Sequence, residues 1–186
     1  MSKRVWHTST SDPLRIDSVA VPGTEAKIGM TLCPGKFQPW GQHGAWRRDL
    51  DTDLAAIKDW GASTLITLIE DREFESLSVT ALPERARAHG LAWYHWPIAD
   101  QQLPGQRFEQ CWQQAFPAVR QRLEGGENLV LHCMGGLGRT GVVAARILIE
   151  FGREPRIAVR RVRAARPGAI ETAAQLRYVM SLQPKG

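Results

Sequence analysis

The most constraining feature of this sequence lies between Asn128 and Phe151, where two apolar runs flank a glycine-rich turn. The first run, NLVLHC (128–133), is short and bounded by turn residues, which is typical of a buried strand. The turn MGGLGR (134–139) is followed by TGVVAARILIEF (140–151), which predicts a helix that is apolar on almost every side. Such a helix needs neighbours all round it, so we expect it to run through the middle of the fold.

Strand and helix patterns alternate along the rest of the chain. We expect strands at 14–22, 27–32, 63–69, 91–98 and 128–133, and helices from about 49 to 61 and at 83–89, 106–124, 140–151, 155–165 and 170–182. The segments 33–46, 70–75 and 99–105 are predicted to be loops. This alternation predicts an α/β fold, with a mostly parallel central sheet of about four to five strands and helices on both faces. In such sheets ligands bind beyond the carboxyl ends of the strands, where the glycine-rich turn lies.

Composition and length exclude several other classes of protein. Residues 1–13 are polar and are expected to be mobile, whereas 14–186 is long enough for a single domain with its own core. The N-terminus lacks the apolar segment of a secretory signal, and 141–151 is too short to span a bilayer, so we expect a cytoplasmic protein. Three scattered cysteines do not form a disulfide framework or a paired-ligand zinc site. The net charge of +5 favours an anionic substrate but is far below that of a dedicated nucleic-acid binder.

The glycine-rich turn has the properties of a phosphate cradle. Between a strand end and a helix N-terminus, successive backbone N–H groups turn toward one point, and the helix dipole adds positive charge there. Arg139, in the first turn of the helix, is placed to hold two phosphate oxygens with its planar guanidinium. The N–H groups expected to contact the phosphate are those of Met134, Gly135, Gly136, Leu137 and Gly138.

Cys133 lies at the mouth of this cradle. The field that would bind a phosphate also stabilises a thiolate, so we expect its pKa to fall well below the value of about 8.5 for a free thiol. A thiolate beneath a held phosphate is placed for in-line attack on phosphorus. Thr140 is placed to donate its hydroxyl to the sulfur as it leaves. His132 is expected to orient the loop by hydrogen bonding rather than to transfer protons.

The turn has two other interpretations. A glycine-rich turn around an inert structural cysteine is disfavoured because His, Cys, three Gly, Arg and Thr occur together at fixed offsets between a strand and a helix. A nucleotide-binding Walker loop is excluded because Arg139-Thr140 stands where Gly-Lys-Ser/Thr would be required.

The segment HCMGGLGRTG (132–141) resembles the phosphate-binding loop of the protein tyrosine phosphatase superfamily, in which cysteine, five residues, arginine and then Ser or Thr follow one another. With HWPIAD (95–100), RPGAIETAAQ (166–175) and CPGKF (33–37), the chain most resembles the dual-specificity branch, especially the cyclin-dependent-kinase-associated phosphatases and their bacterial relatives. The resemblance covers about 31–182. It implies a cofactor-independent and metal-independent phosphatase that hydrolyses phosphotyrosine or phosphoserine/threonine in proteins through a cysteinyl-phosphate intermediate.

The same resemblance implies the partners and the remaining site residues. A phosphoprotein substrate is expected, with no nucleic acid and no membrane, and oxyanions such as vanadate, tungstate or sulfate are expected to occupy the loop. Asp100, 33 residues before the cysteine, matches the general acid, and Asp71 and Glu70 are poorer candidates because they follow a different strand. Gln175 matches a glutamine that positions the hydrolytic water. Glu171 stands where the tyrosine-specific branch has another glutamine, and a carboxylate there would have to point away from the phosphate.

Two further functions remain open at this level. One is a phosphatase of non-protein esters, such as phosphoinositides or RNA 5′ ends, but Met134 and Leu137 add no basic residue to the loop for a second phosphate. The other is a catalytically silent phospho-binding module, which the joint presence of the nucleophile, arginine and acid disfavours. Outside the loop, Trp40 and Trp46 are candidates to line a substrate surface.

Overall fold

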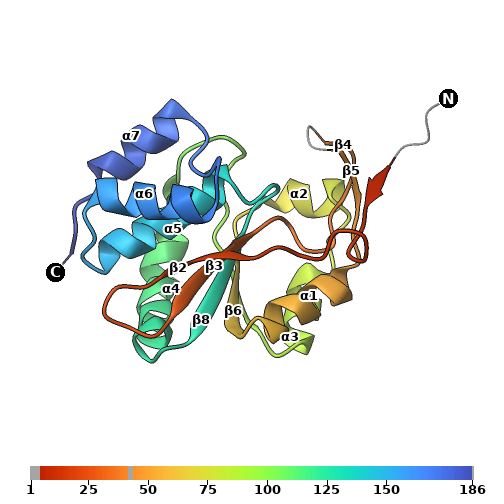
Figure 1. The fold of residues 1–186 in the computed structure, drawn as a ribbon, viewed down its shortest axis with the longest axis horizontal. Coiled ribbons are helices and arrows are strands. Elements are labelled where there is room, and N and C mark those ends of the chain that lie inside the picture. The colour runs from red at the N-terminus through yellow and green to blue at the C-terminus, as the bar shows by residue number, and fades with distance from the viewer. Residues whose placement is uncertain (1–4, 42–43, 186) are drawn as a thin grey trace.

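The computed structural model describes residues 5–41 and 44–185, which are built around a five-stranded sheet (Figure 1). The strand order is β2 (Asp17–Ala20), β3 (Lys27–Thr31), β8 (Asn128–His132), β6 (Ala62–Thr67) and β7 (Ala92–His95). Only β2 is antiparallel to its neighbour, and the other pairings are parallel. The predicted mostly parallel sheet is therefore confirmed.

Helices cover both faces of this sheet. On one face α1 (Leu50–Asp59) and α3 (Leu82–Ala88) pack against β6 and β7, and on the other α4 (Gln106–Glu124) and α5 (Gly138–Glu150) pack against β8 (Figure 1). Outside α5 lie α6 (Pro155–Ala165) and α7 (Ala173–Ser181). Every residue of α5 is buried between them and the sheet, which confirms the predicted central helix. None of the helices in the described ranges combines the length and apolarity needed to cross a bilayer.

The register of the parallel strands brings their carboxyl ends to one edge. His132, the last residue of β8, is opposite Thr31 of β3 on one side and Thr67 of β6 on the other. Thr67 is in turn opposite His95 of β7. The segments that leave these four strands therefore start side by side, although they are far apart in the sequence.

The segment 33–46, predicted to be a loop, instead contains β4 (Phe37–Gly41) and β5 (Gly44–Arg47). These strands form a second, three-stranded sheet with β1 (Trp6–His7). Short strands interrupted by proline and glycine carry little periodicity, and the pairing with β1 depends on residues about forty positions away.

The prediction of a mobile segment 1–13 also differs from the structure from β1 onward, since Ser9 is buried and donates a hydrogen bond to Asp53 at 2.8 Å. Residues 1–4 lie outside the described residues.

The charged segment 70–75, also predicted to be a loop, forms the short helix α2 (Asp71–Ser76). Its start is fixed by a hydrogen bond of 2.7 Å from the N–H of Glu70 to the carboxylate of Glu73. A side chain that caps its own helix in this way is one half of a capping box. The helix has six residues, too few for its apolar periodicity to stand out in the sequence.

Candidate active site

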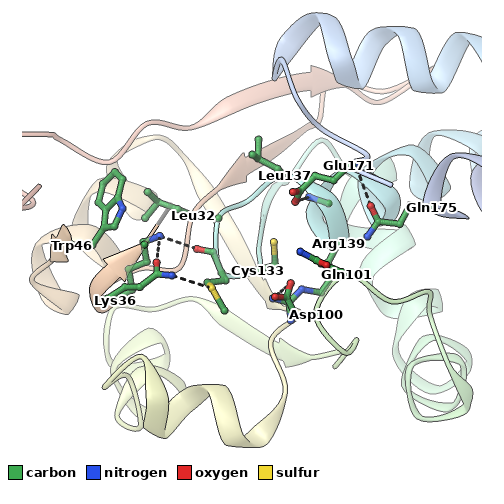
Figure 2. A pocket seen from close by; sticks show the side chains of 15 residues that line it. Leu32, Lys36, Trp46, Asp100, Gln101, Cys133, Leu137, Arg139, Glu171 and Gln175 are labelled. Carbon is green, nitrogen blue, oxygen red and sulfur yellow. Dashed lines mark hydrogen bonds and ion pairs between the residues drawn. The ribbon is translucent and has the colours of Figure 1, made fainter. Parts of the chain in front are cut away.

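The loop between β8 and α5 closes around the sulfur of Cys133 at the floor of a pocket (Figure 2). The N–H of Gly136 donates to Sγ of Cys133 at 3.2 Å, and Cys133 is 3% exposed. Helix α5 begins at Gly138, so its positive N-terminal end faces the same pocket. The predicted juxtaposition of cysteine, loop amides and helix N-terminus is present.

One of the three loop glycines, Gly136, is required by the geometry. Gly136 has φ 73°, and a Cβ there would run into the carbonyl group of Thr31. At Gly138 a Cβ would lie 2.8 Å from a carboxylate oxygen of Glu171, but that oxygen is the end of a flexible side chain and could shift. Gly135 has open space around it and no positive φ.

Arg166 holds the outer side of the loop. Its guanidinium donates to the carbonyl of Gly136 at 2.5 Å and to that of Gly135 at 3.1 Å, and it pairs with Asp17 at 2.9 Å. In a trans peptide the carbonyl and the following N–H point in opposite directions. Carbonyls turned outward to Arg166 therefore leave the N–H groups of Gly136 and Leu137 turned inward. Arg166 is the first residue of RPGAIETAAQ (166–175), but the sequence did not predict its contact with the loop.

His132 supports the loop from inside the sheet. Its Nδ1 lies 3.0 Å from the carbonyl of Cys133, which can only accept, so Nδ1 carries the proton. Nε2 then accepts from the hydroxyl of Thr67 at 2.7 Å, and that oxygen accepts from Trp93 at 2.9 Å. Burial lowers the pKa of His132 to about 4, so the ring is neutral near pH 7. This geometry fits the orienting role predicted for His132.

Arg139 is held by a carboxylate that sequence analysis missed. Its Nη1 and Nη2 donate to the two carboxylate oxygens of Glu73 at 2.7 and 2.9 Å, and Nη1 also donates to the carbonyl of Ile98 at 3.0 Å. Burial opposes the charge of Arg139, but the bonds to Glu73 outweigh it and the pKa is raised. Nε of Arg139 is buried and has no hydrogen-bond partner among the described residues. The guanidinium is thus held by Glu73 through Nη1 and Nη2, while its Nε–H remains an unused donor.

Asp100 lies in the loop after β7 and forms an ion pair with Arg139. One carboxylate oxygen lies 3.1 Å from Nη2 of Arg139, and 49% of the Asp100 side chain is exposed. Both line the pocket together with Cys133 (Figure 2). The competing candidate Asp71 instead pairs with Arg107 on the surface at 2.7 Å. The structure therefore brings Asp100, and not Asp71, to the cysteine.

Glu171 and Gln175 close the far side of the pocket. A carboxylate oxygen of Glu171 accepts from the N–H of Gly138 at 2.8 Å. The N–H of Gly138 was expected to contact the phosphate. In the structure it instead donates to the carboxylate of Glu171, which corrects that expectation. The oxygen of Gln175 accepts from the N–H groups of Glu171 and Thr172, at 2.9 and 3.1 Å, which caps α7.

The hydroxyl of Thr140 is the remaining predicted site group. It is buried in the first turn of α5, and its oxygen has no hydrogen-bond partner among the described residues. A buried hydroxyl normally finds a partner, so its lack of one here leaves it available to a reacting group.

Fold and pocket together define a cysteine-based phosphatase. A family model described as "Polymorphic toxin system, DSP-PTPase phosphatase" matches residues 41–153, more than half of the chain. The chain belongs to this family of dual-specificity-type phosphatases and is an enzyme of that class.

Curated relatives and solved structures agree with this assignment. The chain is 28% identical over 162 residues to rat cyclin-dependent kinase inhibitor 3, covering 85% of this chain and 72% of the relative. It is 29% identical over 143 residues to mouse protein tyrosine phosphatase type IVA 3, covering 77% of each. A structure of kinase associated phosphatase whose catalytic-site cysteine is replaced by serine shares the fold, with a TM-score of 0.77 at 24% identity over 90% of this chain and 92% of that one.

Proposed function

We propose that this chain hydrolyses phosphotyrosine or phosphoserine/threonine esters in proteins, with Cys133 as nucleophile, Arg139 as phosphate clamp and Asp100 as general acid. One observation carries the proposal. The buried guanidinium of Arg139, fixed by Glu73, keeps its Nε unpaired in the wall of the pocket that has the cysteine at its floor. A fixed planar donor beside a nucleophile is what oriented binding of a phosphate requires.

In the first step the sulfur of Cys133 attacks phosphorus, the S–P bond forms and the bond from phosphorus to the ester oxygen breaks. Asp100 gives its proton to the departing oxygen. In the free enzyme Asp100 is paired with Arg139, and an arriving phosphate dianion competes for that guanidinium. Asp100, released from Arg139, is then free to contact the departing ester oxygen.

In the second step a water molecule attacks phosphorus, Asp100 takes one of its protons, and the S–P bond breaks. The hydroxyl of Thr140 donates to the departing thiolate, and the amide of Gln175 orients the water. Inorganic phosphate leaves, and the cysteine is restored. The absence of nucleic-acid and membrane partners and the cytoplasmic location expected from the sequence remain predictions.

The proposal is tested with Cys133→Ser on p-nitrophenyl phosphate and on peptides carrying phosphotyrosine, phosphoserine or phosphothreonine. The serine hydroxyl does not ionise near neutral pH, so turnover should fall below about 1% of wild type. The matched control is Cys111→Ser, since Cys111 lies half-buried on α4 away from the pocket, and it should keep near-normal rates. Activity retained by Cys133→Ser, or faster turnover of phosphoinositides than of every phosphopeptide, would overturn the proposal.

A further inference from the structure

Lys36 differs from the other buried Lys, Arg, Asp and Glu side chains of the described residues. Each of those others pairs with an opposite charge within 3.1 Å. The pairs are Arg48 with Asp53, Arg139 with Glu73, Arg146 with Glu109, and Lys185 with Glu150. Lys36 is 4% exposed and has no ion pair within the described residues. An unpaired buried ammonium is costly, so its presence beside the pocket indicates that negative charge gathers there when the site is occupied.

The ammonium of Lys36 is held in the pocket wall by neutral groups. Its Nζ donates to the side-chain oxygen of Gln38 at 3.1 Å and to the carbonyl of Met134 at 3.4 Å, and it lies 4.7 Å from the ring centre of Trp46. These contacts use two of its three protons as hydrogen-bond donors. In Figure 2 Lys36 and Trp46 lie on one side of Cys133, and the arginine clamp lies on the other.

The contact with Met134 acts on the phosphate loop itself. The carbonyl of Met134 also accepts from the N–H of Cys33 at 3.1 Å, so it points away from the cradle. The N–H of Gly135, on the opposite side of the same peptide, then points inward. Lys36 therefore supports one of the amides expected to bind an oxyanion, and it brings a positive charge to the wall of the same pocket.

Burial and the charged groups around Lys36 make its protonation state depend on pH near neutrality. Burial lowers its pKa to about 8, and the nearby cations Arg48 and Arg166 act in the same direction. Cys33 and Cys133 oppose this shift as thiolates, but burial raises the pKa of Cys33 far above the neutral range. The thiolate expected at Cys133 is the nearby negative charge within the chain, and an oxyanion bound in the cradle adds further negative charge there.

We propose that Lys36, as an ammonium, strengthens oxyanion binding in the cradle at Cys133, and that this binding weakens when Lys36 loses its proton. Lys36 is thus a positioning residue for the proposed function, and the inference rests on the phosphate site named there. It adds a cation from the residue just before β4 to the clamp arginine from α5.

The test measures sulfate binding calorimetrically between pH 6 and pH 10, at constant ionic strength, in a Cys133→Ser background. Sulfate stays a dianion across this range, and the serine removes the titrating thiol, so neither probe nor nucleophile contributes a pH dependence. In this background the Kd should rise about tenfold as pH passes through about 8. Adding Lys36→Met should give the weaker Kd already at pH 7, with no further rise. Adding Lys36→Arg should keep tight binding up to pH 10, because arginine stays charged.

The matched control is Lys58→Met in the same background, because Lys58 is an exposed lysine on α1 and should leave the pH profile unchanged. Melting temperatures at pH 7 check the fold, and Lys36→Met should melt no lower than its parent because it removes an unpaired buried charge. A rise in Kd that persists in the Lys36→Met protein would overturn the inference, as would no sulfate binding by the parent at any pH. Wild-type phosphopeptide turnover is measured separately, so a failure of the proposed function is recognised even if sulfate binding depends on Lys36.

Discussion

The pair between Glu73 and Arg139 shows what single residues contribute to this site. The carboxylate of Glu73 is 7% exposed and Arg139 is 2% exposed, so neither charge is screened by much water. A buried ion pair of this kind contributes little net stability, but removing one partner leaves the other charge uncompensated. The pair is therefore best explained as a device that fixes the orientation of the arginine.

Glu73→Gln tests that orientation. The amide keeps the size of the side chain but loses the charge and one acceptor, so the guanidinium is free to turn. We expect kcat/KM for p-nitrophenyl phosphate to fall about 100-fold, because small misplacements of a clamp cost that much. The free energy of unfolding in urea should fall by about 1–3 kcal/mol, as expected for an unsatisfied buried donor. The control is Glu75→Gln on the exposed side of α2, and a kcat/KM within twofold of wild type for Glu73→Gln would contradict the orienting role.

At the scale of elements, the parallel strands and the N-terminus of α5 position the nucleophile, the arginine and the acid. Strands β7 and β8 end at the same edge, which puts the loop carrying Asp100 beside the loop carrying Cys133. Helix α5 starts where the second loop ends and brings Arg139 within 3.1 Å of Asp100. The acid and the nucleophile therefore belong to different elements that the sheet register holds together.

Asp100→Asn tests the acid loop. A general acid matters most when the leaving group is poor, so turnover of an alkyl or phenyl phosphate should fall about 100- to 10,000-fold. An ester whose leaving phenol is already acidic should lose much less. Phosphate should bind at least as tightly as to wild type, because Asp100 no longer competes for Arg139. Asp71→Asn is the matched control, and equal losses for good and poor leaving groups in Asp100→Asn would return Asp100 to an ordinary loop residue.

At the scale of the whole molecule, the sequence predicted the sheet, the central helix and the residues adjacent in sequence to the nucleophile. Those predictions rest on periodicity and on a motif whose members are close along the chain. The roles of Glu73, Lys36 and Arg166 were missed because each reaches the loop from a distant segment. Lys36 and Arg166 lie within CPGKF (33–37) and RPGAIETAAQ (166–175), but those segments do not show what the two side chains contact. Glu73 follows Glu70 by three residues, which is the spacing of a capping box.

The second sheet was missed for a related reason. Its strands are two to five residues long, and its first strand comes from a segment predicted to be mobile. Yet this small sheet supplies Gln38 and Trp46 to the pocket. The sequence makes Trp46 a candidate to line a substrate surface, and Trp46 does line the pocket. The local sequence pattern thus predicted the loop that carries the nucleophile. The adjacent wall of the pocket depends on strand pairing between segments that are distant in the sequence.

The most direct test of the mechanism is detection of the covalent intermediate. Wild-type protein is mixed with a phosphotyrosine peptide, quenched within one turnover, digested and measured by mass spectrometry. The mechanism predicts the added mass of one phosphoryl group on the peptide that contains Cys133, and none there in Cys133→Ser. Steady turnover with no phosphoryl group on Cys133 at any quench time, or with the group on another residue, would contradict it.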